Sequence, residues 1–336
     1  MKTKVGVLGA SGFTGEKLVD ILLKHPKVEI SYICAKLEKE LKFSELFPKF
    51  KNRLNLVCKE LNLKEASAAV EVAFLALPHK VSQAIAPFFL KNKRIVIDLS
   101  ADYRFNNPKI YEEFYKTKHT DKENLKTAVY GLPEFFRSKI KKAKLIANPG
   151  CYPTVSSLSI APLLKEGLIK NIIIDAKSGI TGAGRRAALE YHYAHLNGNL
   201  FSYKAFGHQH LPEITQTLST ISGKNINLRF TPHIIPVERG IFITVYANLI
   251  KELTSSKLNS IYAKYYKKEP FVRIFKEKLP QLKDVIETNF CDIGFQTKGK
   301  NIVIVGVIDN LIKGASGQAV QNMNIILGWD ETLGLL

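Results

Sequence analysis

The sequence is short of cysteine, acidic residues and long apolar runs, and each shortage excludes a class of protein. Its four cysteines, Cys34, Cys58, Cys151 and Cys291, are scattered without Cys-x-x-Cys spacing. This argues against a disulfide framework and against a zinc site. No apolar run reaches the length of a membrane span, and residues 1–5 lead into a strand pattern instead of a secretory signal. A reducing, cytoplasmic setting without a membrane partner is the simplest expectation.

Acidic residues are outnumbered, since 49 lysines and arginines face 30 acids and give a net charge of +19 at pH 7. Such an excess raises the question of nucleic acid. The lysines are spread through the chain and alternate with acids, as in residues 36–42, and no nucleic-acid-binding module is visible. We therefore expect no nucleic-acid partner and interpret the charge as a lysine-rich surface. Steering of an anionic substrate or partner is the alternative.

The length of 336 residues and the hydrophobic content of 46% predict two globular domains. Strands alternate with helices in the first half, which is typical of a Rossmann-like α/β domain with a doubly wound sheet. The strands are predicted at residues 4–9, 28–34, 72–77, 94–99 and 144–147, and the helices at 16–24 and 81–90.

The pattern changes after residue 165. A strand is predicted at residues 171–177, and a helix opens at residues 207–214. The strands at 227–233 and 241–247 and the pair around 298–301 then follow one another without helices between them. This indicates an α+β domain with a mainly antiparallel sheet, followed by a helix at 315–327. We expect a dinucleotide-binding domain at residues 1–150, completed by 315–336, and a catalytic and oligomerisation domain at 151–314.

A glycine turn joins the first strand to the first helix. Gly9, Gly12 and Gly15 are spaced G-x-x-G-x-x-G, one residue longer than the usual dinucleotide fingerprint. Backbone N–H groups and the helix dipole at such a turn cradle a phosphate, although a turn that serves packing alone is the alternative. The second strand ends without the acid that NAD-binding folds place there, and Lys36 follows. This favours NADP, unless Lys36 is only a surface lysine beside Glu38.

A cysteine follows the last strand of the first domain. An apolar run ends in an Asn-Pro-Gly turn at residues 148–150, and Cys151 comes next. Residues 155–164 predict a helix with Thr154 as its N-cap. Cys151 would then lie in a tight turn near a helix N-terminus, where N–H groups and the dipole stabilise a thiolate. A small residue buried under the turn is the alternative.

Other polar residues follow the carboxyl ends of the predicted strands, where doubly wound sheets bind ligands. Pro78 and His79 follow one strand and residues 100–104 another, so they are predicted to share a rim with the glycine turn and Cys151. His79 is interpreted as an exposed loop residue. Arg104, and Arg185 with Arg186 at the end of a glycine-rich loop, are candidates for binding the substrate carboxylate or the departing phosphate, because a guanidinium fits planar oxyanions.

The chain resembles the N-acetyl-γ-glutamyl-phosphate reductases, which belong to the aspartate-semialdehyde dehydrogenase superfamily. The resemblance covers essentially the full length. One departure is Val155, where the family has a small residue, which changes the packing behind Cys151 but removes no reacting group. The matching segments are Gly9-Ala-Ser-Gly-Phe-Thr-Gly15, Asp98-Leu-Ser-Ala-Asp-Tyr-Arg104, Asn148-Pro-Gly-Cys-Tyr-Pro-Thr154, Ser178-Gly-Ile-Thr-Gly-Ala-Gly-Arg185, His208-Gln-His-Leu-Pro-Glu-Ile214, Phe230-Thr-Pro-His-Ile-Ile-Pro236 and Asp309-Asn-Leu-Ile-Lys-Gly314.

The resemblance implies NADPH-dependent reduction of an acyl phosphate to a semialdehyde in arginine biosynthesis, by a homo-oligomer (dimer or tetramer). It implies that the C-terminal helix returns to the first domain and that Asn310 lies near the nicotinamide. The expected catalytic residues are Cys151 and His208. The expected substrate-binding residues are Arg104, Ser178, Gly179, Arg185, His210 and Glu213. The expected cofactor-binding residues are Gly9, Ala10, Ser11, Gly12, Phe13, Thr14, Gly15, Lys36, Pro78, Ser100, Gly182 and Asn310.

The His208-Gln-His210 pair offers two candidates for proton transfer. If a helix begins at Leu211 and Pro212, His210 lies beside its N-terminus, where the dipole disfavours an imidazolium. His208 lies earlier in the loop, beside Gly207, and is predicted to reach the hemithioacetal oxygen and to cycle through its charged form. Metal binding by the pair is the alternative, but no cluster of acids or cysteines accompanies it, so no metal is expected.

Three rival functions remain open from the sequence. The first is the same chemistry on an aminoadipyl or glutamyl phosphate carried by an acidic carrier protein. The second is aspartate-semialdehyde dehydrogenase, whose catalytic histidine is expected shortly after an Arg-Gly pair, whereas Arg239 and Gly240 are followed here by Ile241 and Phe242. The third is a basic NADP-binding protein without enzymatic activity, which is either a regulatory protein or a nucleic-acid-binding protein.

Overall fold

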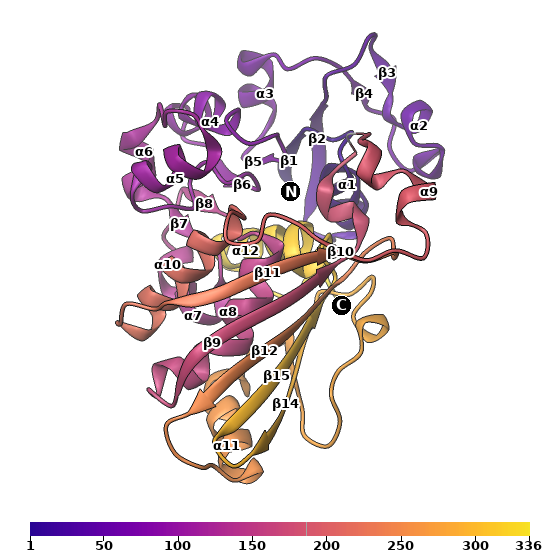
Figure 1. Cartoon of the computed structure of the whole chain (residues 1–336). Coiled ribbons are helices and arrows are strands. Elements are labelled where there is room, and N and C mark those ends of the chain that lie inside the picture. Colours follow the sequence, from indigo (N-terminus) through magenta and orange to yellow (C-terminus); the bar gives the residue numbers. More distant parts are fainter. Residues whose placement is uncertain (186) are drawn as a thin grey trace. The chain divides into compact units, whose positions relative to one another are not determined.

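The structure, a computed structural model, describes residues 1–185 and 187–336 and divides into two compact units. Unit 1 comprises Met1–Pro149 and Ala315–Leu336, and unit 2 comprises Gly150–Gly314 (Figure 1). Arg186, one of the candidate anion-binding residues, lies outside the described residues. In the described part of the chain, no helix combines the length and the apolar character that crossing a bilayer requires.

Unit 1 is built on a six-stranded sheet in which every neighbouring pair is parallel. The predicted parallel α/β architecture is therefore confirmed. The strand order reverses at β1, which has β2 on one side and β5 on the other, and ligands of such sheets bind at this switch point. The order is β2 (Val28–Cys34), β1 (Thr3–Leu8), β5 (Val72–Leu75), β6 (Ile95–Asp98), β8 (Leu145–Ala147) and β7 (Val129–Tyr130).

Helices cover this sheet, and α1 follows β1, the strand at its switch point. The helix α1 begins at Phe13, three residues before the predicted start, because Gly12 serves as its N-cap. The other helices are α3 (Leu63–Ala69), α4 (Ser82–Lys91), α5 (Pro108–Tyr115), α6 (Lys122–Thr127), α7 (Pro133–Ile140) and α12 (Gly317–Ile326). A small excursion contains β3 (Leu41–Lys42), α2 (Phe43–Leu46) and β4 (Val57–Cys58).

Unit 2 has a seven-stranded mixed sheet that is mainly antiparallel, as predicted. Only β11 with β9 and β13 with β14 pair in parallel among its described neighbours. The order is β10 (Phe201–Ser202), β11 (Leu228–Ile234), β9 (Ile169–Ser178), β12 (Ile241–Leu249), β15 (Asn301–Ile308), β14 (Cys291–Lys298) and β13 (Val272–Phe275).

The helix α8 (Cys151–Lys165) packs against the middle strands of the unit 2 sheet, and α10 (His210–Ser222) and α11 (Ser255–Tyr266) lie beside it (Figure 1). The short α9 spans Tyr193–Leu196. The expectation of successive strands without helices was wrong at α11, which separates β12 from β13. Its buried residues Leu258, Ile261 and Tyr262 are spaced as on one face of a helix, so the sequence does contain the signal for α11.

The predicted start of α8 was also wrong. The helix begins at Cys151 with Gly150 as N-cap, and not at residue 155 after a Thr154 cap. Thr154 lies inside the first turn, where its Oγ1 donates to the Gly150 carbonyl at 2.9 Å. Pro153 is compatible with this earlier start, because a first turn tolerates proline where the N–H groups have no partner within the helix. The consequence is that Cys151 occupies the first helical position.

Candidate active site

Cys151 is the cysteine whose surroundings suit a nucleophile. It is partly exposed at the first position of the 15-residue helix α8, whereas Cys34, Cys58 and Cys291 are buried. Burial raises the pKa of Cys34 to about 12 and that of Cys58 to about 11. A helix N-terminus has the opposite effect on a thiol, because its N–H groups and dipole favour the thiolate. The alternative of a buried packing cysteine therefore describes the other three and not Cys151.

Glu213 fixes the residue that precedes this cysteine. Its side chain is fully buried on α10, and Oε1 accepts a hydrogen bond from the Gly150 N–H at 2.8 Å. Gly150 is the N-cap of α8. The sequence predicted Glu213 for substrate binding, and the geometry gives it a contact that positions the start of α8.

His208 lies in an aromatic enclosure instead of on a free loop. It is 3% exposed, and its ring contacts Tyr203, Phe230 and Tyr152 with centroids 5.4, 5.5 and 5.7 Å away. Burial, with a smaller contribution from Lys204, lowers its pKa to about 3. The expectation that His208 moves freely was therefore wrong, and desolvation disfavours the imidazolium that the predicted proton cycle requires.

The tautomer of His208 follows from its neighbour. Its Nδ1 accepts a hydrogen bond from the His210 backbone N–H at 3.0 Å, so the proton of the neutral ring is on Nε2. The helix α10 begins at His210, one residue before the predicted start at Leu211, and Pro212 lies in its first turn. His208 is therefore a neutral hydrogen-bond donor through Nε2.

Tyr152 brings the two histidines to the start of α8. Its ring lies 5.7 Å from that of His208, 5.8 Å from that of His210 and 5.2 Å from that of Phe230. Since Tyr152 follows Cys151 directly, both imidazoles border the first turn of α8. The sequence did not identify Tyr152 or Phe230 as site residues, although the alternation of strand β11 marks Phe230 as inward-facing.

The glycine-rich loop after β9 is tied to neighbouring loops of unit 2. Ser178 is buried and its Oγ donates to the Gly179 carbonyl at 2.9 Å, and a Cβ at Gly182 would lie 2.9 Å from that same Oγ. Asn310 is also buried, and its Nδ2 donates to Thr181 Oγ1 at 3.1 Å. These predicted ligand-binding residues thus share one network, while Arg185 is exposed.

In the glycine turn of unit 1, Gly9 and Gly15 lie tightly against backbone atoms, whereas Gly12 has room for a side chain. Gly9 has φ of 89°, and a Cβ there would lie 2.2 Å from the Ala76 carbonyl oxygen; a Cβ at Gly15 would lie 2.2 Å from that of Gly9. At Gly12 the nearest atom would be 3.7 Å away. The N–H groups of Gly9 and Ala10 both donate to the Cys34 carbonyl at 2.9 Å, which holds the turn against β2. The first turn of α1 contains Phe13, Thr14 and Gly15. Its N-cap is Gly12, and Ser11 precedes that glycine.

Three further predicted cofactor residues follow strands of unit 1. Lys36 is exposed after β2 and forms no ion pair among the residues described. Pro78 is exposed after β5, and the adjacent His79 is more than a loop residue, because its Nδ1 accepts the Ala101 N–H at 3.0 Å. Ser100 is buried, and its N–H and Oγ donate to the Asp98 carboxylate at 3.0 and 2.8 Å.

Arg104 and the two acids beside Ser100 are buried in the same unit. The Arg104 Nε donates to the Asn148 carbonyl at 2.8 Å and its Nη2 to the Leu99 carbonyl at 2.8 Å. Two of its donors therefore brace the chain near the ends of β6 and β8. Burial, followed by the charge of Asp102, raises the pKa of Asp98 to about 7.

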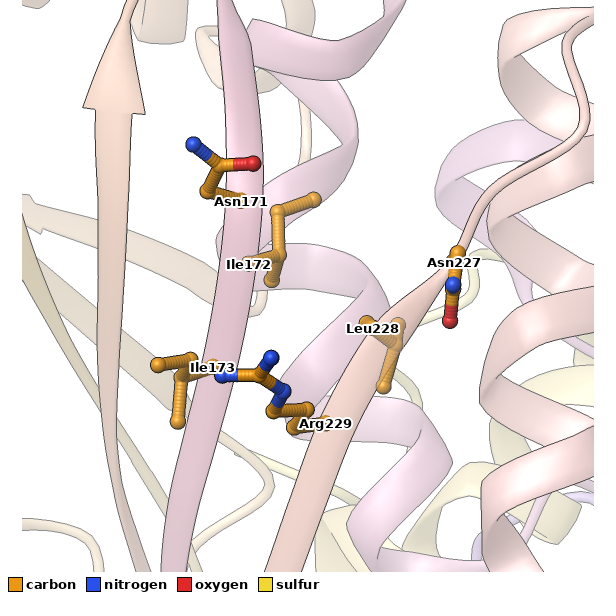
Figure 2. Close-up of a pocket in the computed structure, with 6 residues that line it drawn as sticks. All are labelled: Asn171, Ile172, Ile173, Asn227, Leu228 and Arg229. Carbon is orange, nitrogen blue, oxygen red and sulfur yellow. The ribbon is translucent and has the colours of Figure 1, made fainter.

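A pocket in unit 2 lies away from the glycine-rich loop of the same unit. Figure 2 shows Arg229 and Ile173 on neighbouring strands, with Asn171, Ile172, Asn227 and Leu228 completing the lining. Ile173 precedes Ser178 by five residues on β9, or roughly 17 Å of strand. The pocket therefore belongs to the opposite end of the strands from the glycine-rich loop. Within residues 1–185 and 187–336, no group of three or more His, Cys, Asp or Glu is arranged to hold a metal ion.

Two family descriptions match the chain. Residues 4–143 match the semialdehyde dehydrogenase NAD-binding domain, and residues 151–310 match the semialdehyde dehydrogenase dimerisation domain. Solved structures agree with this fold. Aspartate semialdehyde dehydrogenase II of Vibrio cholerae, in complex with ASA, has a TM-score of 0.74 at 17% identity, covering 98% of this chain and 99% of that one. Aspartate semialdehyde dehydrogenase of Candida albicans with NADP has a TM-score of 0.73 at 15% identity, covering 97% and 99%.

Sequence relatives are more specific. A protein of Campylobacter jejuni subsp. jejuni named N-acetyl-gamma-glutamyl-phosphate reductase is 47% identical over 340 residues, covering 100% of this chain and 98% of the relative. A protein of Alkaliphilus metalliredigens with the same name is 44% identical, covering 99% of this chain and 97% of the relative. The chain therefore belongs to the N-acetyl-gamma-glutamyl-phosphate reductase family of the semialdehyde dehydrogenases.

Proposed function

We propose that the chain catalyses NADPH-dependent reduction of N-acetyl-γ-glutamyl phosphate to N-acetylglutamate 5-semialdehyde and phosphate, in cytoplasmic arginine biosynthesis. The observation that carries the proposal is the position of Cys151 at the start of α8, with His208 and His210 bordering the same turn. The names of the relatives, at 44 and 47% identity over nearly the whole chain, support the substrate.

Cys151 is proposed as the covalent nucleophile. Its thiolate attacks the γ-carbonyl carbon of the acyl phosphate, a C–S bond forms, and the C–O bond to phosphate breaks. NADPH, when bound, supplies the hydride that reduces the resulting thioester. The thiohemiacetal then takes up a proton at its oxygen and later returns one as the C–S bond breaks, which releases the aldehyde and restores the thiolate.

His208 is proposed to act on that oxygen as a neutral imidazole. Its Nε2–H donates a hydrogen bond to the developing oxyanion, which stabilises charge without requiring an imidazolium. His210, at the first position of α10, is the candidate for exchanging the proton itself. The sequence assigned proton exchange to His208, but a pKa of about 3 leaves its ring uncharged at working pH.

The anionic parts of the substrate are proposed to meet Arg104, Arg185 and the loop of Ser178 and Gly179. Arg185 is exposed, and the Arg104 guanidinium is held in place by its hydrogen bonds to the carbonyls of Asn148 and Leu99. Glu213 is proposed to act through Gly150, by holding the start of α8, instead of contacting the substrate directly.

NADP is proposed to bind in unit 1, at residues 1–150 with 315–336. The open Gly12 at the N-cap of α1 fits a pyrophosphate that approaches the backbone, and the exposed Lys36 fits a 2′-phosphate. Pro78 and Ser100 border the same strand ends. Gly182 and Asn310 are proposed to serve the nicotinamide from residues 151–314.

A homo-oligomer, either a dimer or a tetramer, is proposed from the match of residues 151–310 to a dimerisation domain. Sedimentation velocity on the purified chain tests this assembly, and a monomer at working concentration would contradict it.

The test of the function is a spectrophotometric assay in the reverse direction. N-acetylglutamate semialdehyde, phosphate and NADP are expected to give NADPH, followed at its absorbance. Aspartate semialdehyde in parallel is expected to give none. A forward assay that compares free with carrier-linked acyl phosphate tests the remaining substrate rival. Activity only on the carrier-linked form would assign the chain to that reaction.

A further inference from the structure

Asp309 is a fully buried acid that the proposed reaction does not use. It follows β15 and accepts hydrogen bonds at Oδ1 from the N–H groups of Leu311 and Ile312, at 2.8 and 3.2 Å. Its Oδ2 accepts the Glu287 N–H at 2.9 Å. The carboxylate therefore shapes the turn of residues 309–314, the last segment of unit 2.

Arg239 supplies the positive charge that this buried acid requires. Its Nη2 lies 3.1 Å from Oδ1 and 3.0 Å from Oδ2 of Asp309, and its side chain is 9% exposed. The Nη1 donates to the Glu287 carboxylate. An ionised acid in the protein interior is tolerated when it is paired and hydrogen-bonded, so Asp309 and Arg239 depend on each other.

The clamped turn touches the site residues at both of its ends. At one end, Asn310 Oδ1 accepts the Gly240 N–H at 2.6 Å, and Nδ2 reaches Thr181 in the glycine-rich loop. At the other end, the Gly314 N–H donates to the Asp309 carbonyl at 2.9 Å, and a Cβ added at Gly314 would lie 2.8 Å from the Cβ of Cys151. The turn therefore packs directly against the nucleophile.

We propose that Asp309 and Arg239 form a positioning clamp, which holds the 309–314 turn against Cys151 and keeps the thiol in its reactive orientation. The proposal rests on the assignment of Cys151 as nucleophile. Neither clamp residue contacts the reacting atoms. Their effect is transmitted through Gly314 to the cysteine and through Asn310 to the glycine-rich loop.

The test compares Asp309→Asn with Asp292→Asn. Asp292 is the matched control because it is also a fully buried acid of unit 2 paired with an arginine, with Arg273 Nε and Nη2 at 2.6 and 2.7 Å. Asp309→Asn is expected to lower kcat by about 10- to 100-fold, since small displacements of reacting groups have effects of this size. Asp292→Asn is expected to lower Tm while kcat of the folded protein stays at the wild-type value.

Alkylation of Cys151 by iodoacetamide gives a readout that does not depend on turnover. Release of Gly314 uncovers one side of the thiol, so Asp309→Asn is expected to alkylate several-fold faster at Cys151 while kcat falls. Peptide mass spectrometry is expected to find Cys34, Cys58 and Cys291 unmodified, which excludes general unfolding. Faster modification of all four cysteines, or equal Cys151 rates in both proteins, would overturn the clamp.

Arginine variants keep the proposal testable if Asp309→Asn fails to fold. Arg239→Lys retains the charge and is expected to lose less kcat than Arg239→Met, and Gly314→Ala is expected to lower kcat with both clamp residues intact. Wild-type kcat in Gly314→Ala would overturn the proposal. Absence of turnover in the wild type would count against the proposed reaction alone, because the alkylation comparison would still report on the clamp.

Discussion

The helices α1 and α8 begin with almost the same backbone and are put to different uses. Gly12, the N-cap of α1, has φ −73° and ψ 162°, and Gly150, the N-cap of α8, has φ −68° and ψ 157°. Neither cap uses a side-chain hydrogen bond. In unit 1 the start is left open, which suits an anion that approaches the backbone. In unit 2 the Glu213 carboxylate accepts the N–H of the N-cap, and Cys151 is the first helical residue. The helix terminus there acts on a side chain of the protein and not on a bound anion.

Replacement of the nucleophile is expected to have the largest effect. It should abolish the function of the α8 start and leave that of the α1 start unchanged. Cys151→Ser keeps the fold and the α1 terminus but replaces a thiolate with a hydroxyl that stays protonated. We expect turnover to fall by roughly 10⁴-fold or more, in line with the loss of other covalent nucleophiles. NADP affinity in a fluorescence titration should be unchanged, and mass spectrometry should detect no acyl-enzyme. Substantial residual turnover would remove the covalent mechanism.

The histidines sharpen the description of the α8 side. His208→Asn is expected to lower kcat by about 10²- to 10⁴-fold, the usual contribution of a group that assists proton transfer or charge stabilisation. Because the pKa of His208 is about 3, a limb of the pH–rate profile near neutrality should persist in this variant. His210→Asn should remove that limb. If His208→Asn removes it instead, the enclosed imidazole does become charged during catalysis and the roles must be exchanged.

The pH dependence of the free energy of unfolding tests the protonation state of His208 independently of turnover. Its pKa in the folded protein is about 3 against an ordinary value of 6.5, so between these values the unfolded chain binds the extra proton. The contribution of His208 to the free energy of unfolding is therefore present above about pH 6.5 and is lost as the pH falls towards 3. Denaturant titrations should show a smaller decline over this window in His208→Asn. An identical decline in both proteins would contradict the assigned protonation state.

The open glycine of α1 is expected to give the next largest effect. Gly12→Ala finds room in the structure, and we expect it to fold normally while KM for NADP rises about 10- to 100-fold, because a methyl group keeps the pyrophosphate from the backbone N–H groups. Gly15→Ala is the matched control, since its Cβ would lie 2.2 Å from the Gly9 carbonyl oxygen. That variant should lower Tm. Unchanged KM for NADP in Gly12→Ala would mean that the turn serves packing alone.

Lys36 is expected to give the smallest effect. We expect the wild type to have a higher kcat/KM with NADP than with NAD. Lys36→Glu should reduce that preference roughly fivefold, because an exposed charge interacts weakly across solvent. Both cofactors should be compared at low and high salt, where screening reduces the difference. A higher kcat/KM with NAD in the wild type would show that the missing acid after β2 was misinterpreted.

The fold was predictable where a local pattern coincided with a tertiary role. Buried strands separated by helices identified the parallel sheet of unit 1, and the Asn-Pro-Gly turn located Cys151. The burial of His208 was not predictable, because Phe230 and Tyr152 come from distant parts of the chain and only the folded unit brings them to the ring. The roles of Glu213 and Asp309 were hidden for the same reason, since a carboxylate carries no local signal of the N–H groups it will accept.

The path of the chain determines the order in which this protein can be completed during synthesis. The helix α12 is the last one in the sequence, yet it belongs to unit 1, where Gln318 and Asn322 donate to the Gly131 carbonyl at 2.7 and 2.9 Å and Asn324 pairs with His25 at 3.0 Å. All of unit 2 leaves the ribosome before these partners exist. Unit 2 can therefore fold first, and the first 149 residues wait for the last helix with part of their interior uncovered. A premature stop near the end of the message would damage the beginning of the protein.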